Sequence, residues 1–578
     1  MTCTKFKLTT VAALVFAATN ANAALYKVVE VTPSITGASE IYGVAIQPGK
    51  AVNANAVLPA LPDEELALGC FDSNATNCAD STFKLAGETR NGVNGLGYRE
   101  EVPFAMDAPF QYIQERDDFE NYCFRELKYS TCESWADNRW SIWSQERAST
   151  AYVNAKAFIE DGVTFESRNT AINSLDASAH PVGVKSEGAI RSNALFTTTA
   201  GPSGTSETRA WRAIKASNGT IYNVGSVSEE QTPTDTSEPD KAFSSRAAIW
   251  DGTTTKELGW IRGGDAKQGD YFAQGSMRSI VESNSIFYGV GYNTEDGNGD
   301  LQDMNASVFV SDSLDISGAI WQTKVISGAE VKSGSSNDDA IYSNSVATDI
   351  NDNLFAVGYS KRNGFVPESG SAGNKMFVVT DASASTPTAT YLSGGIFFGG
   401  SSGEAKAVNN FNEFVGQVDA ETTREVDGSE RRHRGFIYPY NVASSKDERR
   451  VDIFNGQAWW LDDLTNDGNA SGENNKFRII DASDINDAGV ISATAIKCTV
   501  GGTTQPYDTT SHNSYCGGAA SNAVEEVVAV KLIPIGGKGK ADIQTRSTDT
   551  EKVDRQGGSL GWLGLTVLGL LGFRRKFK

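Results

Sequence analysis

Two stretches of the chain repeat one pattern: Ala347-Thr348-Asp349-Ile350-Asn351-Asp352-Asn353 and Ala482-Ser483-Asp484-Ile485-Asn486-Asp487-Ala488. Each leads into a short apolar run, residues 354–357 after the first and residues 489–491 after the second. Asn and Asp favour turns because their side chains hydrogen-bond to the nearby backbone, and short apolar runs between turns are typical of strands. The pattern therefore predicts a polar turn that leads into a buried β-strand.

A looser form of this pattern recurs along the chain. It has an aliphatic residue, seven intervening positions and a small residue that closes an apolar run, and it fits Ile35/Gly43, Leu175/Gly183, Val281/Gly289, Ile350/Gly358, Val408/Gly416 and Ile485/Ala493. A seventh copy, Ile214 to Gly225, has extra residues. The closing residues lie 42 to 140 positions apart, and the shortest spacing matches one four-stranded propeller blade. The sequence predicts an all-β propeller of about seven blades, with a β-solenoid or stacked sandwiches as alternatives.

Further strand-like runs follow most copies, at residues 193–196, 247–250, 307–310, 375–379, 434–438 and 527–530. Near the start, Leu25 to Val31 alternates apolar and polar residues. We expect this segment to pair with Val527 to Ile533 and close the ring, which would remove both free sheet edges.

The two Asp-Ile-Asn turns and the unit Ala248-Ile249-Trp250-Asp251-Gly252 resemble the repeats of extracellular HAF-type proteins. More broadly, the chain is similar to an uncharacterised family of exported bacterial proteins that pair such repeats with a C-terminal sorting tail. The resemblance spans most of residues 24–536. It implies an extracellular repeat fold, and the family has no established activity that could be carried over to this chain.

The longest spacing holds an insertion at about residues 53–160. Its core, Gln111 to Arg147, is charged and aromatic and is the best helix candidate in the chain; its aromatic residues are Phe119, Tyr122, Phe124, Tyr129, Trp135, Trp140 and Trp143. One interpretation is a disulfide-stapled cap that buries its own aromatic side chains. The other is a lid that contacts a ligand, since Trp and Tyr are favoured at binding surfaces.

The formal net charge is -21. Such a charge repels phosphate backbones and anionic lipid, so it disfavours nucleic-acid binding and is explained by solubility. Six cysteines follow the N-terminal segment, and their clustering favours the local pairs Cys70–Cys78, Cys123–Cys132 and Cys498–Cys516. An even number in an exported chain indicates disulfides. Zinc is disfavoured because there is no Cys-x-x-Cys and only 3 histidines.

The N-terminus has the three parts of a secretory signal peptide, residues 1–23. Lys5 and Lys7 precede an apolar stretch, and Ala21-Asn22-Ala23 is a small-x-small cleavage pattern that places the mature start at Ala24. The alternative is a buried N-terminal helix. This segment predicts export and processing by signal peptidase.

The C-terminus carries a second targeting signal, residues 557–578, behind a polar linker at residues 537–556. Its uncharged run Ser559 to Phe573 has 15 residues, about 22 Å as a helix against a bilayer core of about 30 Å. The basic residues after it would stay in the cytoplasm. A transient inner-membrane insertion is therefore favoured over a permanent membrane helix.

This tail, with Gly557-Gly558 followed by an apolar run and a basic end, resembles the GlyGly-CTERM sorting signal of Gram-negative bacteria. The resemblance implies cleavage near Gly557 and Gly558 by a rhomboid-type sorting protease (rhombosortase). It also implies export by the type II secretion machinery and a final location at the cell surface, in the outer membrane or outside the cell.

The sequence contains few candidates for chemistry. Gly399-Gly400-Ser401-Ser402-Gly403 matches the G-x-S-x-G nucleophile elbow, with His433 or His512 as a base, but the elbow requires a helix directly after it. Asp296 to Asp300 and Asp463 to Gly468 are rich in oxygen ligands, which leaves structural calcium open, although polar turns are the default. No catalytic residue and no cofactor are assigned.

Taken together, these features predict an exported, surface-associated β-repeat protein with a binding or structural role. The alternative is a secreted hydrolase of polysaccharide or protein with its site in the central channel. An aromatic-lined pocket with two carboxylates about 5–10 Å apart would favour that alternative.

Overall fold

The computed structural model describes residues 24–546, apart from residues 36, 39, 55–63, 91–114, 125–128, 166–168, 190–191, 206, 233–241, 269–270, 297–302, 331–343, 362–372, 421, 423–430, 443–447, 469–472, 506–515 and 517–521. The expected signal peptide and the sorting tail with Gly557 and Gly558 lie outside the described residues, as do Ala21 and Ala23.

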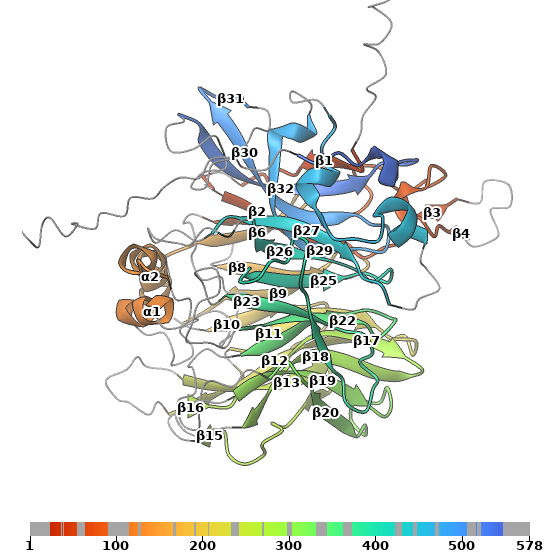
Figure 1. Cartoon of the computed structure of the whole chain (residues 1–578). Coiled ribbons are helices and arrows are strands. Elements are labelled where there is room, and N and C mark those ends of the chain that lie inside the picture. Colours follow the sequence, from red (N-terminus) through yellow and green to blue (C-terminus); the bar gives the residue numbers. More distant parts are fainter. Residues whose placement is uncertain are drawn as a thin grey trace, which may run out of the picture.

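Seven antiparallel sheets surround a common axis, so the predicted all-β propeller is confirmed (Figure 1). Each sheet is one blade, numbered here along the chain, and its strands run outward from the axis. Blade 1 contains β2 (Glu40–Ile46), β5 (Leu85–Arg90), β6 (Ala155–Ile159) and β7 (Val163–Phe165); blade 2 contains β8 (Thr170–Leu175), β9 (Pro181–Ser186) and β10 (Asn193–Phe196); blade 3 contains β11 (Arg209–Lys215), β12 (Ile221–Gln231), β13 (Ala242–Trp250) and β14 (Thr255–Glu257).

The remaining blades have the same antiparallel order. Blade 4 contains β17 (Gly275–Ser283), β18 (Ile286–Asp296), β19 (Asp303–Ser311) and β20 (Trp321–Val325); blade 5 contains β21 (Ser345–Ile350), β22 (Ala356–Lys361), β23 (Asn374–Val379) and β24 (Ala389–Tyr391); blade 6 contains β25 (Gly403–Val408), β26 (Glu413–Asp419), β27 (His433–Pro439) and β28 (Trp459–Trp460); blade 7 contains β29 (Phe477–Ile485), β30 (Ile491–Val500), β32 (Val524–Pro534) and β1 (Tyr26–Glu30).

Smaller elements decorate the ring. The hairpins are β3 (Val52–Asn53) with β4 (Glu64–Glu65) and β15 (Lys267–Gln268) with β16 (Tyr271–Phe272), and β31 (Thr503–Thr504) pairs with β30. The helices are α1 (Arg116–Tyr122), α2 (Glu133–Ala148) and α3 (Leu461–Leu464), with short turns at Gly69–Phe71, Arg449–Ile453, Asn474–Lys476 and Lys540–Asp542. Within the described part of the chain, no helix combines the length and apolar character that crossing a membrane requires.

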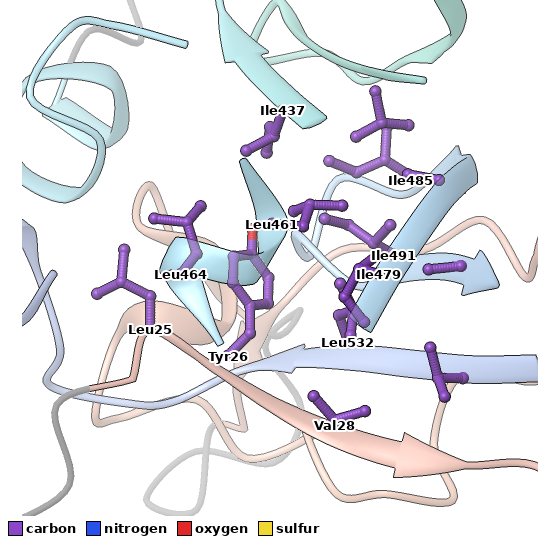
Figure 2. Close-up of a cluster of buried hydrophobic side chains, with 14 of the residues drawn as sticks. Leu25, Tyr26, Val28, Ile437, Leu461, Leu464, Ile479, Ile485, Ile491 and Leu532 are labelled. Atoms are coloured by element: carbon purple, nitrogen blue, oxygen red, sulfur yellow. The ribbon is translucent and has the colours of Figure 1, made fainter. Parts of the chain in front are cut away.

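The ring is closed in two ways. The first strand of each blade lies against the first strand of the next, in the cyclic order β2, β8, β11, β17, β21, β25, β29 and back to β2. In blade 7, β1 pairs with β32 from Tyr26↔Pro534 to Glu30↔Val530, as the alternation of Leu25 to Val31 predicted. The two ends of the described chain therefore share one sheet, and Figure 2 shows Tyr26 of β1 inside the apolar cluster with Leu461, Leu464 and Leu532.

The small residue of the repeat has a specific steric cause. The first strand of each blade has a β-bulge, and the second strand places a small residue opposite it: Gly87, Gly183, Gly225, Gly291, Gly358, Gly416 or Ala493. A Cβ atom at Gly225 would lie 1.9 Å from the carbonyl oxygen of Arg209, and one at Gly416 would lie 1.9 Å from that of Glu404. At these two positions only glycine permits such a close approach without displacing the neighbouring strand.

Two copies of the loose repeat are corrected by the strand pairing. Gly43 lies in β2, the first strand of blade 1, and faces Gly87, which is the true second-strand glycine. In blade 4 the glycine opposite the bulge is Gly291, two residues after Gly289, because the hairpin there is longer. The other copies mark the start of a second strand, and the six further runs all lie in third strands.

The single insertion expected at about residues 53–160 is two insertions. The segment Leu85–Arg90 is buried and pairs with both β2 and β6, so it belongs to the blade and divides the expected insertion. The first part carries the β3–β4 hairpin, and the second carries α1 and α2, which lie to the left in Figure 1.

The helical insertion packs as a cap on one face of the propeller. Phe119, Trp135 and Trp143 are buried in one apolar cluster with residues of blades 3, 4 and 5, namely Phe243, Tyr292, Met304 and Val346. These aromatic side chains thus hold the cap in place. Phe124 is 40% exposed and does not take part in this cluster.

The three disulfides join the pairs that their clustering suggested: Cys70–Cys78, Cys123–Cys132 and Cys498–Cys516. They close loops with sequence separations of 8, 9 and 18 residues. Each staples an insertion or a long hairpin rather than the blades themselves, whose closure depends on strand pairing.

Candidate functional site

The aspartates of the two quoted stretches occupy equivalent places near the axis. In blade 5, Asp349 accepts the backbone N–H of Val408 at 2.9 Å, which belongs to β25 of blade 6. In blade 7, Asp484 accepts the backbone N–H of Ile46 at 3.0 Å, which belongs to β2 of blade 1. Each aspartate therefore fastens the first strand of its blade to the first strand of the next.

The other oxygen of each carboxylate is also used. Asp349 Oδ1 accepts the Ser279 hydroxyl at 2.6 Å and the Ile350 N–H at 3.0 Å, and Asp484 Oδ1 accepts the Ile485 N–H at 3.0 Å. Carboxylates with several such donors serve first as structural acceptors.

A cation reaches these carboxylates from a blade that is not adjacent to either. Arg212 extends from β11 of blade 3, and its Nη2 lies 3.4 Å from Asp349 Oδ1. Burial lowers the pKa of Arg212, but the negative charges of Asp349 and Asp484 raise it by more. Burial raises the pKa of Asp484 to about 6, and Arg212 and the Ile46 N–H offset this only in part.

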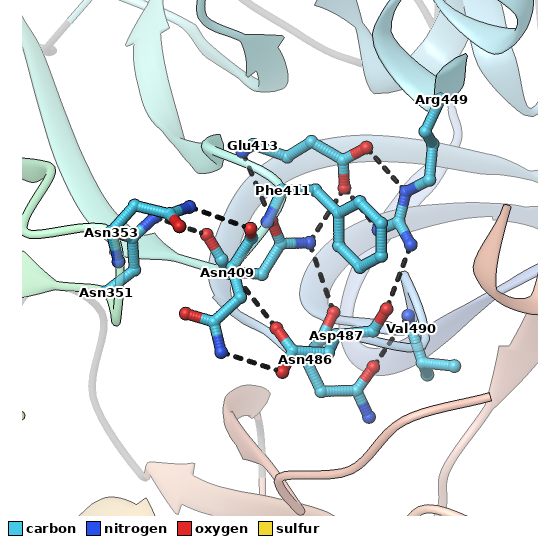
Figure 3. A network of polar contacts seen from close by, with 10 residues as sticks. Asn351, Asn353, Asn409, Phe411, Glu413, Arg449, Asn486, Asp487 and Val490 are labelled. Carbon is cyan, nitrogen blue, oxygen red and sulfur yellow. Dashed lines mark hydrogen bonds and ion pairs between the residues drawn. The ribbon is translucent and has the colours of Figure 1, made fainter. Parts of the chain in front are cut away.

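The asparagines of the same motif form a second ring of contacts. Asn351 donates to the carbonyl of Asn409 at 2.8 Å, and Asn409 donates to that of Asn486 at 3.2 Å (Figure 3). Asn486 in turn donates to the carbonyl of Gln47 at 3.0 Å. These contacts run from blade 5 through blades 6 and 7 to blade 1. Each asparagine also accepts the N–H four residues later, from Phe355, Glu413 and Val490.

A buried ion pair reinforces this ring. Arg449 Nε donates to Glu413 Oε1 at 2.6 Å, and both side chains are almost fully buried. Arg449 Nη1 also donates to the carbonyl of Asp487 at 2.9 Å, and its guanidinium lies 4.0 Å from the ring centroid of Phe411 (Figure 3). These hydrogen-bonded amide and charged side chains therefore join blades 5, 6, 7 and 1.

The expected elbow at Gly399-Gly400-Ser401-Ser402-Gly403 does not form. Strand β25 begins at Gly403, where a nucleophile elbow would begin a helix. Ser401 is buried, and the Ser402 hydroxyl accepts the N–H of Asn374 at 3.1 Å. His433 Nε2 lies 3.1 Å from Asp419, which also pairs with Arg431 at 2.8 Å. His512 lies outside the described residues.

Of the two oxygen-rich segments, the second is described and forms a structural turn. In the second segment, Asp463 accepts the Arg546 N–H at 2.7 Å, and Asn466 accepts the Gly468 N–H at 3.1 Å. In the first, Asp296 ends β18 and the following residues are not described. Among the described residues, no three His, Cys, Asp or Glu side chains are placed to hold a metal ion.

A groove of about 650 Å³ lies at the rim, where the outermost strands of blades 5 and 6 meet. Its aromatic lining comes from both blades and consists of Tyr391, Phe397, Tyr438, Tyr440, Trp459 and Trp460. Ser393, Gln457 and Asp463 add polar groups, and Gly394 and Gly395 form a tight turn at its edge.

One acid faces the groove. Asp463 is 8% exposed, and burial raises its pKa to about 6, against the opposing effect of the hydrogen bond from the Arg546 N–H. Its neighbour Asp462 accepts the N–H of Ile479 at 2.8 Å, so it serves the fold. The two acids therefore do not form a pair that opens into the groove.

Sequence reasoning did not single out this groove. Its only local signal is the adjacent pair Trp459-Trp460 together with Tyr438 and Tyr440 at the end of a predicted strand. Tyr391 and Phe397 join them only because blade 5 lies against blade 6.

Comparison with models of known families identifies the family of the chain. The family model described as "Protein of unknown function (DUF3466)" matches residues 212–576. The chain belongs to this family. The match of this DUF3466 protein covers blades 4 to 6, blade 7 apart from β1, most of blade 3 and most of the C-terminal tail.

Similar solved structures are distant. A protein of unknown function from Dyadobacter fermentans aligns with 88% of this DUF3466 chain and 98% of its own, with 9% identity and a TM-score of 0.33. The native arabinanase Arb43A of Bacillus subtilis aligns with 56% of this chain and 95% of its own, with 12% identity and a TM-score of 0.22. No curated protein matches the chain. These similarities support no inference about a ligand or a reaction.

Proposed function

We propose that this DUF3466 protein is an exported, surface-associated propeller that binds a ligand and does not catalyse a reaction. One observation carries the binding role: the acids at the axis are committed to the fold. Asp349 and Asp484 together accept five protein N–H or hydroxyl groups, three of them from neighbouring blades. A general acid or base needs a carboxyl oxygen within reach of substrate, whereas these oxygens hold strands together.

Several features support export to the cell surface. Three disulfides are typical of an oxidising compartment. Strand β1 starts at Tyr26, directly after the expected cleavage position before Ala24, so removal of residues 1–23 would take nothing from the closing sheet. The HAF-like turns and the GlyGly-CTERM-like tail agree with this route, through signal peptidase, transient membrane insertion, a rhomboid-type protease and type II secretion.

The fate of both ends tests this proposal. Mass spectrometry of the native protein from the producing cell should find an N-terminus at Ala24 and a new C-terminus near Gly557 or Gly558. A Gly557→Leu, Gly558→Leu chain should keep its tail and stay in the inner-membrane fraction. Surface material that retains Lys578 would contradict the sorting proposal, and free thiols at all six cysteines would contradict the compartment.

The hydrolase alternative is favoured by one observation. Asp484 has a pKa of about 6 and shares Arg212 with Asp349 near the axis, and perturbed acids are more frequent at active sites than elsewhere. If it is correct, the purified protein should release reducing ends or peptides from a polymer, and Asp484→Asn should abolish this while the protein remains folded. Binding without turnover would refute it.

A further inference from the structure

We infer that the rim groove between blades 5 and 6 binds a neutral oligosaccharide. This inference rests on the proposed binding role and names the ligand class. It begins with the way the aromatic side chains are held. Tyr438, Tyr440 and Trp460 are each half-buried, and their inner sides pack against a fully buried cluster that includes Phe355, Phe414 and Phe436.

The ring contacts fix these side chains before any ligand arrives. Tyr440 stacks on Phe355 with centroids 5.5 Å apart, Tyr438 lies 5.5 Å from Phe414, and the two tyrosines lie 5.4 Å from each other. Rings held in this way lose little conformational freedom on binding, which favours affinity for a weakly interacting ligand. The groove therefore presents a rigid aromatic surface.

The chemistry of the lining selects an amphipathic ligand. An aromatic face carries partial negative charge and attracts the C–H groups of a saturated ring. Ser393, Gln457 and the backbone turn at Gly394 and Gly395 place hydrogen-bonding groups at the edge of these faces. A pyranose or furanose ring has both parts, apolar C–H faces and a rim of hydroxyl groups. A purely apolar ligand would leave the polar edge without partners.

Charge favours a neutral ligand. The chain has a net charge of -21, which repels anions. Among the described lining residues Asp463 is the single charged one, but it is buried and accepts the Arg546 N–H. Burial raises its pKa to about 6, and the Arg546 N–H and the positive charges of Arg434 and Arg546 offset this only in part. A quaternary ammonium ion would require an exposed carboxylate beside the rings, and Asp463 does not supply one.

The size and edges of the groove disfavour a peptide. A volume of about 650 Å³ lies within the range of about 300–1,000 Å³ typical of small-ligand sites. A peptide that adds a strand needs a free edge of several residues. The edge strands here, β24 and β28, have only 3 and 2 residues.

Titration calorimetry on the native protein from the producing cell tests the inference. The probes are neutral hexasaccharides of glucose, galactose, mannose, xylose or arabinose, with tetramethylammonium chloride and a galacturonic acid hexasaccharide as competing classes. At least one neutral hexasaccharide should bind and quench tryptophan fluorescence. Trp460→Ala should weaken its affinity by about fivefold or more, because loss of a stacked aromatic group costs on the order of 1 kcal/mol.

A second variant keeps the test valid if Trp460→Ala disturbs packing. Ser393→Ile adds bulk at an exposed position of the groove, so it should weaken binding about fivefold or more with an unchanged melting temperature. Phe124→Ala is the matched control, since it removes an exposed aromatic side chain of the distant cap; it should leave affinity unchanged.

Three outcomes would overturn the inference: no hexasaccharide binding at millimolar concentration, binding that both groove variants leave unchanged, or preferential binding of tetramethylammonium or the acidic sugar. The export proposal is judged separately by the two termini of the same preparation. Processed termini without sugar binding would refute only this inference, whereas sugar binding by an unprocessed chain would refute only the sorting route.

Discussion

At the axis of this propeller, polar side chains face polar partners, and at the rim between blades 5 and 6, aromatic side chains face solvent. Asp349, Asp484 and Asn409 bond to the backbone of neighbouring blades, while Tyr438 and Trp460 are buried on one side only. The difference separates two duties. Changes at the axis should cost stability, and changes at the rim should cost binding.

The largest stability loss is expected from the buried ion pair Arg449–Glu413, which joins blade 6 to the turn of blade 7. Arg449→Ala leaves the Glu413 carboxylate buried without its cation, and loss of one partner of such a pair costs about 3–5 kcal/mol. The free energy of unfolding from denaturant titration measures this loss. The exposed pair Lys27–Asp80 is the control, and Lys27→Ala should cost less than about 1 kcal/mol. Equal losses in the free energy of unfolding for the two variants would show that the buried ion pair contributes no more than the exposed one.

The pH dependence of the free energy of unfolding tests the role of Asp484 near the axis. The folded pKa of Asp484, about 6, lies above the unfolded value near 3.9, so this carboxyl favours the folded state most below about pH 4 and least above about pH 6. The free energy of unfolding of the native protein minus that of Asp484→Asn should therefore fall by about 2–3 kcal/mol between about pH 4 and pH 8. A difference that rises with pH would contradict the assigned burial of Asp484.

The bulge glycines should give the next largest effect. Gly225→Ala places a Cβ atom 1.9 Å from the Arg209 carbonyl oxygen and should destabilise the fold by about 1–3 kcal/mol through strand displacement. Gly259→Ala is matched, because its Cβ atom would have no neighbour within 4 Å, and it should stay within about 0.5 kcal/mol of the unchanged protein. Thermal unfolding compares them, and a harmless Gly225→Ala would show that the bulge relaxes.

Much of the fold could be predicted because the residues that build it act locally. The asparagine of each Asp-Ile-Asn turn bonds to its own hairpin four residues later, and the glycine opposite each bulge is required by the adjacent strand. The first blade was misread because Leu85–Arg90 lies between two insertions and lacks the turn signal. The repeat pattern does not constrain the lengths of the segments between strands, so it could not locate this strand.

The rim groove could not be predicted for the opposite reason. Tyr391 and Trp460 lie in different blades and meet only after the sheets are packed side by side. The partners of Arg212 were hidden in the same way, since it reaches Asp349 across the intervening blade 4. A single sequence shows residue types at these positions and gives no sign of the distance between them.

The smallest stability effect belongs to the groove itself. Ser393→Ile should change the free energy of unfolding by less than about 0.5 kcal/mol, because Ser393 is exposed. Equilibrium denaturation, run beside Gly225→Ala, measures this. A loss of stability as large as that of the bulge variant would show that the groove residues also stabilise the fold, and it would contradict the separation of stability at the axis from binding at the rim.

The pairing of β1 with β32 determines when the ring can close during synthesis and export of the chain. A chain that crosses a membrane N-terminus first presents Tyr26–Glu30 early, yet its partner Val524–Pro534 emerges more than 490 residues later. Until then β1 has no partner strand, and the hydrogen bonds that close the ring cannot form. Maturation therefore ends with the arrival of the far end of the polypeptide, and a chain truncated before residue 524 would leave its first strand without a partner for good.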